Sequence, residues 1–214
     1  MIDMDTTLTR ARRSFGRRHL WLAGLIVASL TACASGPPAK LYLLEALSTD
    51  QEARNLSDKP AFKSLGISPV ELPSYVGEAR ITGVNQDGTV SHDDRHRWAE
   101  EPQAAISRVF SDRLRIRSGS TVLIEPWPRD FAPAARVEVS FAKLLREPMG
   151  GVDMAGQILL LSGDGRRLLK AVPFQFTLYG REKDKQVFFE AVAQGVDDIA
   201  RMTIQALSEL RLKS

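Results

Sequence analysis

Residues 136–141 read Arg-Val-Glu-Val-Ser-Phe, and residues 172–178 read Val-Pro-Phe-Gln-Phe-Thr-Leu. In both stretches every second side chain is apolar, which is the pattern of a β-strand that buries one face. Between them, residues 156–161 are apolar on both faces, which indicates a strand inside the sheet. A Ser-Gly-Asp-Gly turn at 162–165 joins the second segment to the third. Together these segments predict a β-meander.

Shorter strands are predicted before this meander. They span residues 41–45, 65–72, 80–84, 89–92 and 121–124. The Asn-Gln-Asp-Gly sequence at 85–88 indicates a hairpin turn between the third and fourth of them. Pro69 has no N–H donor, which favours an edge strand or a bulge at that point.

Two helices are predicted, one on each side of the meander. The first spans Gln103 to Arg115, and its apolar residues recur at helical spacing: Ile106, Val109, Phe110 and Leu114. The second spans Gln186 to Leu210, with an apolar stripe made by Val192, Val196, Ile199, Thr203, Ala206 and Leu210. The order of strands, helix, strands, helix predicts the α/β class, a single domain with a mixed β-sheet and helices packed on it. We expect Phe110 and Phe174 to be buried between these layers.

The N-terminal residues have the order of a lipoprotein signal peptide. Residues 1–19 carry five arginines, residues 20–30 are uncharged and mostly apolar, and Leu30-Thr31-Ala32-Cys33 follows. The apolar run is shorter than the ~20 residues that cross a bilayer. In a lipobox of this kind the cysteine accepts diacylglycerol and the peptide bond before it is cut. An ordinary signal peptide with an accidental cysteine is the alternative.

Cys33 is the only cysteine in the chain, and lipidation accounts for it. We therefore expect export to the periplasm of a Gram-negative-type bacterium, cleavage before Cys33, and covalent N-acyl and S-diacylglycerol lipid on that residue. The basic run around Arg12-Arg13 leaves general and twin-arginine export both open. Ala34 follows the cysteine in place of a retention Asp, which predicts sorting to the outer membrane.

Three regions result: a signal peptide at 1–32, a lipidated flexible tether at 33–40, and a domain at 41–214. Removing the five Arg and two Asp of the signal peptide from the totals of 29 basic and 26 acidic residues leaves 24 of each. The mature chain is therefore electrically neutral, which gives no support for a nucleic-acid partner.

The sequence shows no catalytic constellation. It has no Gly-x-Ser-x-Gly elbow, no Gly-x-Gly-x-x-Gly turn and no phosphate loop, so we expect a non-enzymatic protein with no cofactor other than its lipid. The cluster from Ser91 to Trp98 holds His92 and His96 beside Asp93 and Asp94, which is a possible metal site. A solvated strand end is the competing interpretation, because histidines four residues apart share a face only on a helix.

Three aromatic residues are candidates for a protein interface. Trp98 and Trp127 each lie at a boundary between predicted elements, and Tyr75 follows Leu-Pro. A boundary Trp either caps the edge of a core or anchors a protein contact, where Trp is enriched. We expect a loop to present His96, Arg97 and Trp98 outward.

Four short motifs occur together in this chain. They are Tyr42-Leu43-Leu44, the pattern Ile-x-Pro-Val-x-Leu-Pro-x-Tyr at 67–75, His-Arg-Trp-Ala-Glu at 96–100, and Pro126-Trp127. In this combination the chain resembles the ABC-type transport auxiliary lipoproteins of the PqiC/YmbA type, over essentially the whole mature length. It departs from them at 77–81, where Gly-Glu-Ala-Arg-Ile replaces an Arg-Pro-Gln-Ile-Val-like strand, and at Glu101 and Gln103.

The resemblance implies a role in intermembrane phospholipid traffic. Its fold would be of the TolB N-terminal, anticodon-binding-like type. It would sit at the periplasmic face of the outer membrane and dock a PqiB-like MCE-domain conduit and its inner-membrane component, with several copies forming a homo-oligomeric ring. Tyr75, His96, Arg97, Trp98 and Trp127 would belong to the contact surface. The alternative is a periplasmic carrier that binds lipid or another small ligand itself.

Overall fold

The strand β6 (Ala135–Arg146) joins the two halves of the sheet, because it is paired on both edges. On one edge it runs antiparallel to β7 (Val152–Ser162) along its whole length, from Ala135↔Ser162 to Arg146↔Val152. Its other edge is shared: β2 (Ser64–Ile67) pairs parallel with residues 135–137, and β3 (Arg80–Val84) reaches Arg146. These elements belong to a compact unit, Ala39–Ser214, of which the computed structural model describes residues 39–45, 61–148, 151–179 and 186–213; of the preceding residues it describes Pro38.

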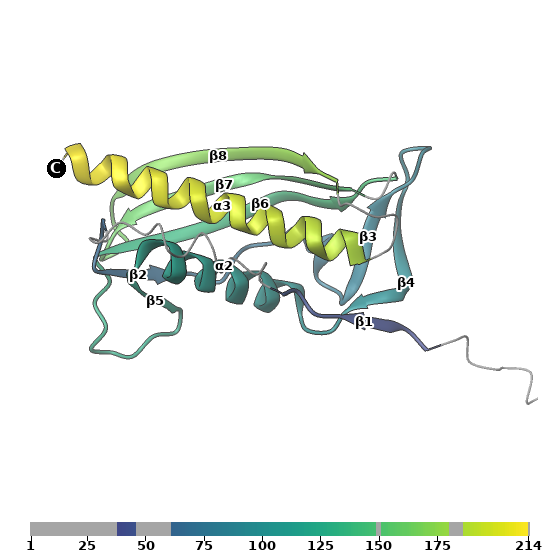
Figure 1. The fold of residues 1–214 in the computed structure, drawn as a ribbon, viewed down its shortest axis with the longest axis horizontal. Helices are drawn as coiled ribbons and strands as arrows, with labels where there is room; N and C mark the ends of the chain where they lie inside the picture. Colours follow the sequence, from purple (N-terminus) through teal and green to yellow (C-terminus); the bar gives the residue numbers. More distant parts are fainter. Residues whose placement is uncertain (1–37, 46–60, 149–150, 180–185, 214) are drawn as a thin grey trace, which may run out of the picture. The chain divides into compact units, whose positions relative to one another are not determined.

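The remaining strands extend the sheet outward from this centre (Figure 1). β5 (Thr121–Ile124) pairs parallel with β2, and β8 (Leu168–Leu178) pairs antiparallel with β7. On the side of β3, β4 (Val90–Trp98) pairs antiparallel and β1 (Lys40–Tyr42) then adds parallel to β4. The described sheet therefore has eight strands of mixed direction.

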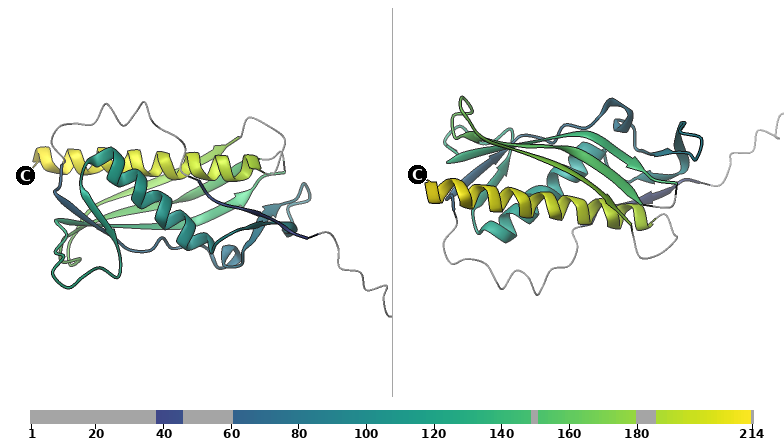
Figure 2. Two further views of the ribbon diagram at one scale, coloured as in Figure 1. Left: turned by 60° about the horizontal axis from the view of Figure 1, so that its bottom comes forward. Right: turned by 90° about the horizontal axis from the view of Figure 1, so that it is seen from above.

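Two helices cover one face of this sheet, and in the described residues no helix covers the other (Figure 2). The first, α2 (Pro102–Ser118), begins where the Glu101 side chain accepts a hydrogen bond from Ala104 N at 2.8 Å. It ends at Gly119, whose φ of 65° is the left-handed conformation that glycine adopts most easily. The second is α3 (Gln186–Lys213), and a 3₁₀ turn, η2 (Ser74–Val76), precedes β3.

The core lies between the sheet and the helices. Val137, Val139 and Phe141 of β6 are all at most 5% exposed, as the alternation predicted. The apolar stripe of α3 belongs to the same core, and at Gly195 this helix comes so close to β7 that a Cβ atom would lie 2.4 Å from the Met154 sulfur. The helix can approach this closely because glycine has no side chain there.

The predicted fold class is confirmed: the domain is α/β, with a mixed sheet and two helices packed on it. The strand at 156–161 is interior, between β6 and β8, as predicted. The prediction for Pro69 was wrong in one respect. β2 lies inside the sheet and ends before Pro69, and the chain then continues beside β6 through the Glu71↔Ser140 bridge.

Replacing Phe110 with Ala should strongly destabilise the domain, because this ring is 1% exposed between α2 and the sheet. A buried Phe replaced by Ala typically costs about 3–5 kcal/mol of the free energy of unfolding. Phe131→Ala is the matched control, because Phe131 is only half-buried and packs edge-on against Trp127. Thermal melts of the two variants should show the larger drop for Phe110→Ala. Equal melting temperatures would contradict this description of the core.

Candidate functional site

The edge formed by β1 and β4 collects most of the residues that the sequence singled out. Tyr42 of β1 is paired in register with Trp98 of β4, and both side chains face the helix layer. There Phe189 of α3 stacks on Tyr42 at 5.0 Å between ring centroids and meets Trp98 edge-on at 4.9 Å. Phe188 approaches Trp98 from another side at 5.9 Å. The edge is thus attached to α3 by a cluster of four aromatic rings.

Trp98 is 2% exposed, so the prediction that a loop presents it outward is wrong. The physical reason is that β4 continues to Trp98 instead of ending at residue 92, and its pairing with β1 turns the indole toward α3. Of the two interpretations of this Trp, the structure supports the one that places it at the edge of the core.

His96 and Arg97 lie on opposite sides of the same strand. His96 Nδ1 is 3.1 Å from both carboxylate oxygens of Asp93, and its ring is 5.9 Å from that of Tyr42. Arg97 is partly exposed, and its Nε donates to the Asp94 carbonyl oxygen at 3.4 Å. Among the described residues no group of three His, Cys, Asp or Glu side chains is arranged to hold a metal ion.

Tyr75 and Trp127 do not join this cluster. The Tyr75 hydroxyl accepts a hydrogen bond from Leu144 N at 3.2 Å, and its carbonyl accepts one from Thr82 Oγ1 at 2.9 Å, so it ties η2 to β6 and β3. Trp127 follows β5 and lies against Gly66 of β2, where a Cβ atom would come within 2.9 Å of the indole. Whether either residue contacts a partner stays a prediction, and Cys33 lies outside the described residues.

Two leucines at this edge were not among the predicted site residues: Leu41 in β1, and Leu43, which follows it. Leu41 is 65% exposed and Leu43 is 58% exposed, among the few large apolar side chains in the described residues that face solvent. The signal was present in the sequence, because residues 41–44 read Leu-Tyr-Leu-Leu and are apolar on both faces. A strand with that pattern at the rim of a sheet must expose one of its apolar faces.

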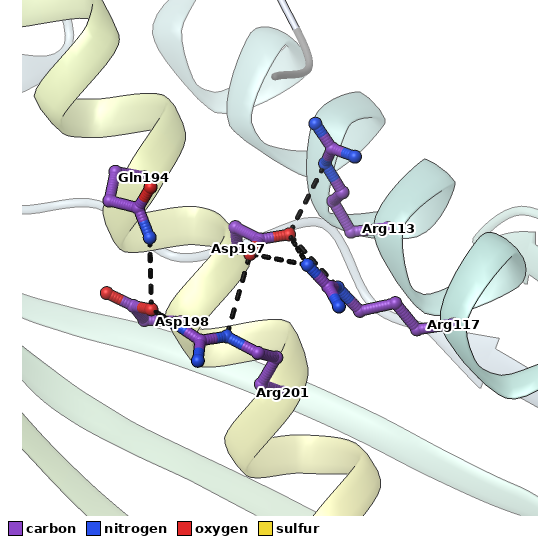
Figure 3. Close-up of polar contacts among 6 residues, drawn as sticks. All are labelled: Arg113, Arg117, Gln194, Asp197, Asp198 and Arg201. Carbon is purple, nitrogen blue, oxygen red and sulfur yellow. Dashed lines mark hydrogen bonds and ion pairs between the residues drawn. The ribbon is translucent and has the colours of Figure 1, made fainter. Parts of the chain in front are cut away.

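A buried ion cluster between the helices was also missed (Figure 3). The Asp197 carboxylate of α3 is 6% exposed and accepts from Arg117 of α2, with Nη2 at 2.8 and 2.7 Å from its two oxygens. Arg113 Nε lies 3.5 Å from the same carboxylate, and Arg201 Nε lies 3.6 Å away. A bidentate Arg–carboxylate contact of this kind fixes the relative orientation of the two side chains as well as their distance, so the cluster holds α2 against α3.

A hollow of about 710 Å³ opens on the sheet, lined by residues of β6, β7 and β8. Ser140, Gln157 and Pro173 form one of its rows, as register partners across the three strands. Outside the hollow, Lys143 of β6 donates a hydrogen bond to Asp153 of β7. This bond raises the pKa of Lys143, so the lysine stays cationic at neutral pH. The hollow is open to solvent, and its lining combines Phe141, Pro173 and Phe174 with the polar Ser140, Gln157 and Gln175.

Asp197→Asn should destabilise the fold, because it removes the negative charge of the buried carboxylate that Arg113 and Arg117 contact. Breaking a buried ion pair in this way typically costs about 3–5 kcal/mol of the free energy of unfolding. Asp198→Asn is the matched control, since Asp198 pairs with Arg201 at the surface, where an ion pair contributes about 0–1 kcal/mol. Denaturant unfolding of both variants measures the difference. If Asp198→Asn proves the more destabilising, the cluster does not hold the helices together.

Trp98→Ala should reduce the free energy of unfolding by about 3–5 kcal/mol and so lower the melting temperature strongly, because Trp98 is buried. Trp127→Ala should cost less, because Trp127 is only half-buried. The assembly of the Trp98 variant with its partners should survive at low temperature, where the domain remains folded. The reverse result, an unchanged melting temperature with loss of assembly, would show that Trp98 contacts a partner and does not stabilise the core.

Comparisons with known proteins agree with this geometry. The family model described as "ABC-type transport auxiliary lipoprotein component" matches residues 42–202. No match was found among curated proteins. A solved structure of an uncharacterized protein superposes with a TM-score of 0.64 at 16% identity, covering 80% of this chain and 100% of its own. A DUF330 protein from Xanthomonas campestris gives 0.60 at 10% identity, covering 78% and 95%.

At these identities the two solved structures show the fold alone. The family model carries the assignment, because its match begins at Tyr42 of β1 and extends into α3, and so includes the aromatic cluster of the β1–β4 edge. Neither α2 nor α3, nor any other helix in the described residues, combines the length and the hydrophobicity of a membrane-spanning helix. The chain belongs to the family of ABC-type transport auxiliary lipoprotein components.

Proposed function

We propose that this protein is a non-catalytic docking subunit of an MCE-type intermembrane phospholipid transport system. It is anchored at the periplasmic face of the outer membrane by lipid on Cys33, and it docks the far end of an MCE-domain conduit, with several copies forming a ring. The observation that carries the proposal is the family match over residues 42–202, which makes the chain an auxiliary component of a transporter.

The packing of the domain favours docking over cargo binding. A carrier that shields a lipid tail needs a deep apolar pocket that surrounds most of its ligand. The space between sheet and helices is instead filled by side chains such as Val139, Phe110 and Val192, each at most 3% exposed. The hollow over β6–β8 opens to solvent and is lined in part by Gln157 and Gln175. Arg97 and Trp127, both partly exposed, remain candidates for the docking surface.

Cys33→Ser should abolish acylation and release the protein from the outer membrane. One acyl chain anchors only marginally, and stable attachment needs two signals, which the modified cysteine supplies with its several chains. Metabolic labelling with a fatty-acid analogue and membrane fractionation would measure both effects. Mature, labelled protein in the outer-membrane fraction of the variant would refute the anchor.

Docking and carrying are separated by purification of the intact lipoprotein from its own membranes in mild detergent. Docking predicts that an MCE-domain protein co-purifies and that bound phospholipid stays well below one molecule per chain. A stoichiometric phospholipid without any MCE-domain protein would overturn docking in favour of the carrier.

A further inference from the structure

Residues 41–44, which are the end of β1 and the two residues that follow it, alternate between two chemically different sides. Tyr42 and Leu44 face the helices: Tyr42 stacks on Phe189, and Leu44 is fully buried. Leu41 and Leu43 alternate with them and therefore project from the other side, where they are 65% and 58% exposed. The described residues place no strand beyond β1, so this pair of leucines lies at the rim of the sheet (Figure 1).

The position of this pair in the chain indicates what covers it. Cys33 precedes Lys40 by seven residues, and a fully extended chain spans at most about 3.6 Å per residue. The first residue of β1 therefore lies within about 25 Å of the lipid-bearing cysteine. The other strongly exposed apolar side chains among the described residues, including Leu168 on β8 at the opposite edge, follow the tether much later in the chain.

The charges beside the leucines fit a phospholipid surface. Lys40 is exposed immediately before Leu41, and the register partner of Leu41 is Arg97, which projects away from the buried Trp98. The exposed Glu45 follows on the other side, after the last leucine. Exposed leucines with neighbouring cations are typical of segments that lie in the interface between headgroups and acyl chains. The outer backbone edge of β1 can form hydrogen bonds with water and headgroups at that depth, which it could not do in the hydrocarbon core.

We infer that Leu41 and Leu43 form a second membrane contact, which rests in the interfacial layer of the leaflet that holds the Cys33 lipid. The inference rests on the proposed anchoring through Cys33. The contact orients the domain, because a tether alone would let it rotate, whereas β1 is rigidly joined to α3 by the aromatic cluster. The β1 edge then faces the bilayer, and the surfaces on β5 and β8 face away from it.

The test uses the full lipoprotein with Leu43→p-benzoylphenylalanine, reconstituted into vesicles of phosphatidylethanolamine and phosphatidylglycerol and irradiated. A phospholipid adduct at position 43, identified by mass spectrometry, is the expected result. Leu168→p-benzoylphenylalanine is the matched control, because Leu168 is exposed to a similar degree on the far edge and should give no lipid adduct. Ser35→p-benzoylphenylalanine is the positive control, because it lies two residues from the anchor.

The controls separate failure of the inference from failure of the anchor. A lipid adduct at position 35 without one at position 43 would overturn the second contact while leaving the anchor intact. A protein adduct at position 43 would overturn it too, and would assign the leucines to another copy or a partner. If the unmodified chain does not stay with the vesicles, the proposed anchoring itself fails, and the second contact with it. Melting curves of the position-43 and position-168 variants confirm that both remain folded.

Discussion

The structure depends on the pairing of β6 along both of its edges. β7 occupies one edge from end to end, while β2 and β3 follow one another along the other. The strands β5, β4 and β1 are attached to the sheet only through β2 or β3. Since Val137, Val139 and Phe141 all project from one face of β6, this face has to be covered, and both helices lie on it.

The position of α3 then links sites that are far apart in the sequence. Gly195 lets the helix approach Met154 in the middle of the sheet. Near the start of the helix, Phe188 and Phe189 cover Trp98 and Tyr42, and so hold the β1 edge. Two residues beyond Gly195, the buried carboxylate of Asp197 orients α2 through Arg117. One helix therefore sets the position of the N-terminal edge, of the central strands and of the other helix.

The features that were predictable from sequence are those with a local cause. At 137–141 every second residue is apolar, as in a strand with one buried face, and at 192–210 the apolar residues recur at helical spacing. In both cases the residues predicted to be buried are buried or pack against the core. Trp98 was misplaced because its burial is created by Phe188 and Phe189, some ninety residues later. In the sequence Asp197 looks like an ordinary acidic residue of a helix, and its burial in an ion cluster depends on Arg113 and Arg117 of α2, which are 80 or more residues away in the chain. Leu41 and Leu43 were read as part of a strand, but the sequence does not tell which side of that strand α3 covers.

The two sides of β1 connect these points to the proposed function. If Cys33 carries the proposed lipid, the tether at 33–40 limits how far the domain can move from the membrane but does not by itself fix the orientation of the domain. A docking subunit binds its partner more tightly when its orientation is already fixed, because the rotational entropy that it has lost at the membrane is not lost again on binding. Tyr42 and Leu44 hold β1 in the core, so any contact made by Leu41 and Leu43 is transmitted to a rigid body. In that arrangement the edge nearest the tether serves the membrane, and the sheet surface over β6–β8, with its open hollow, is left for a protein partner.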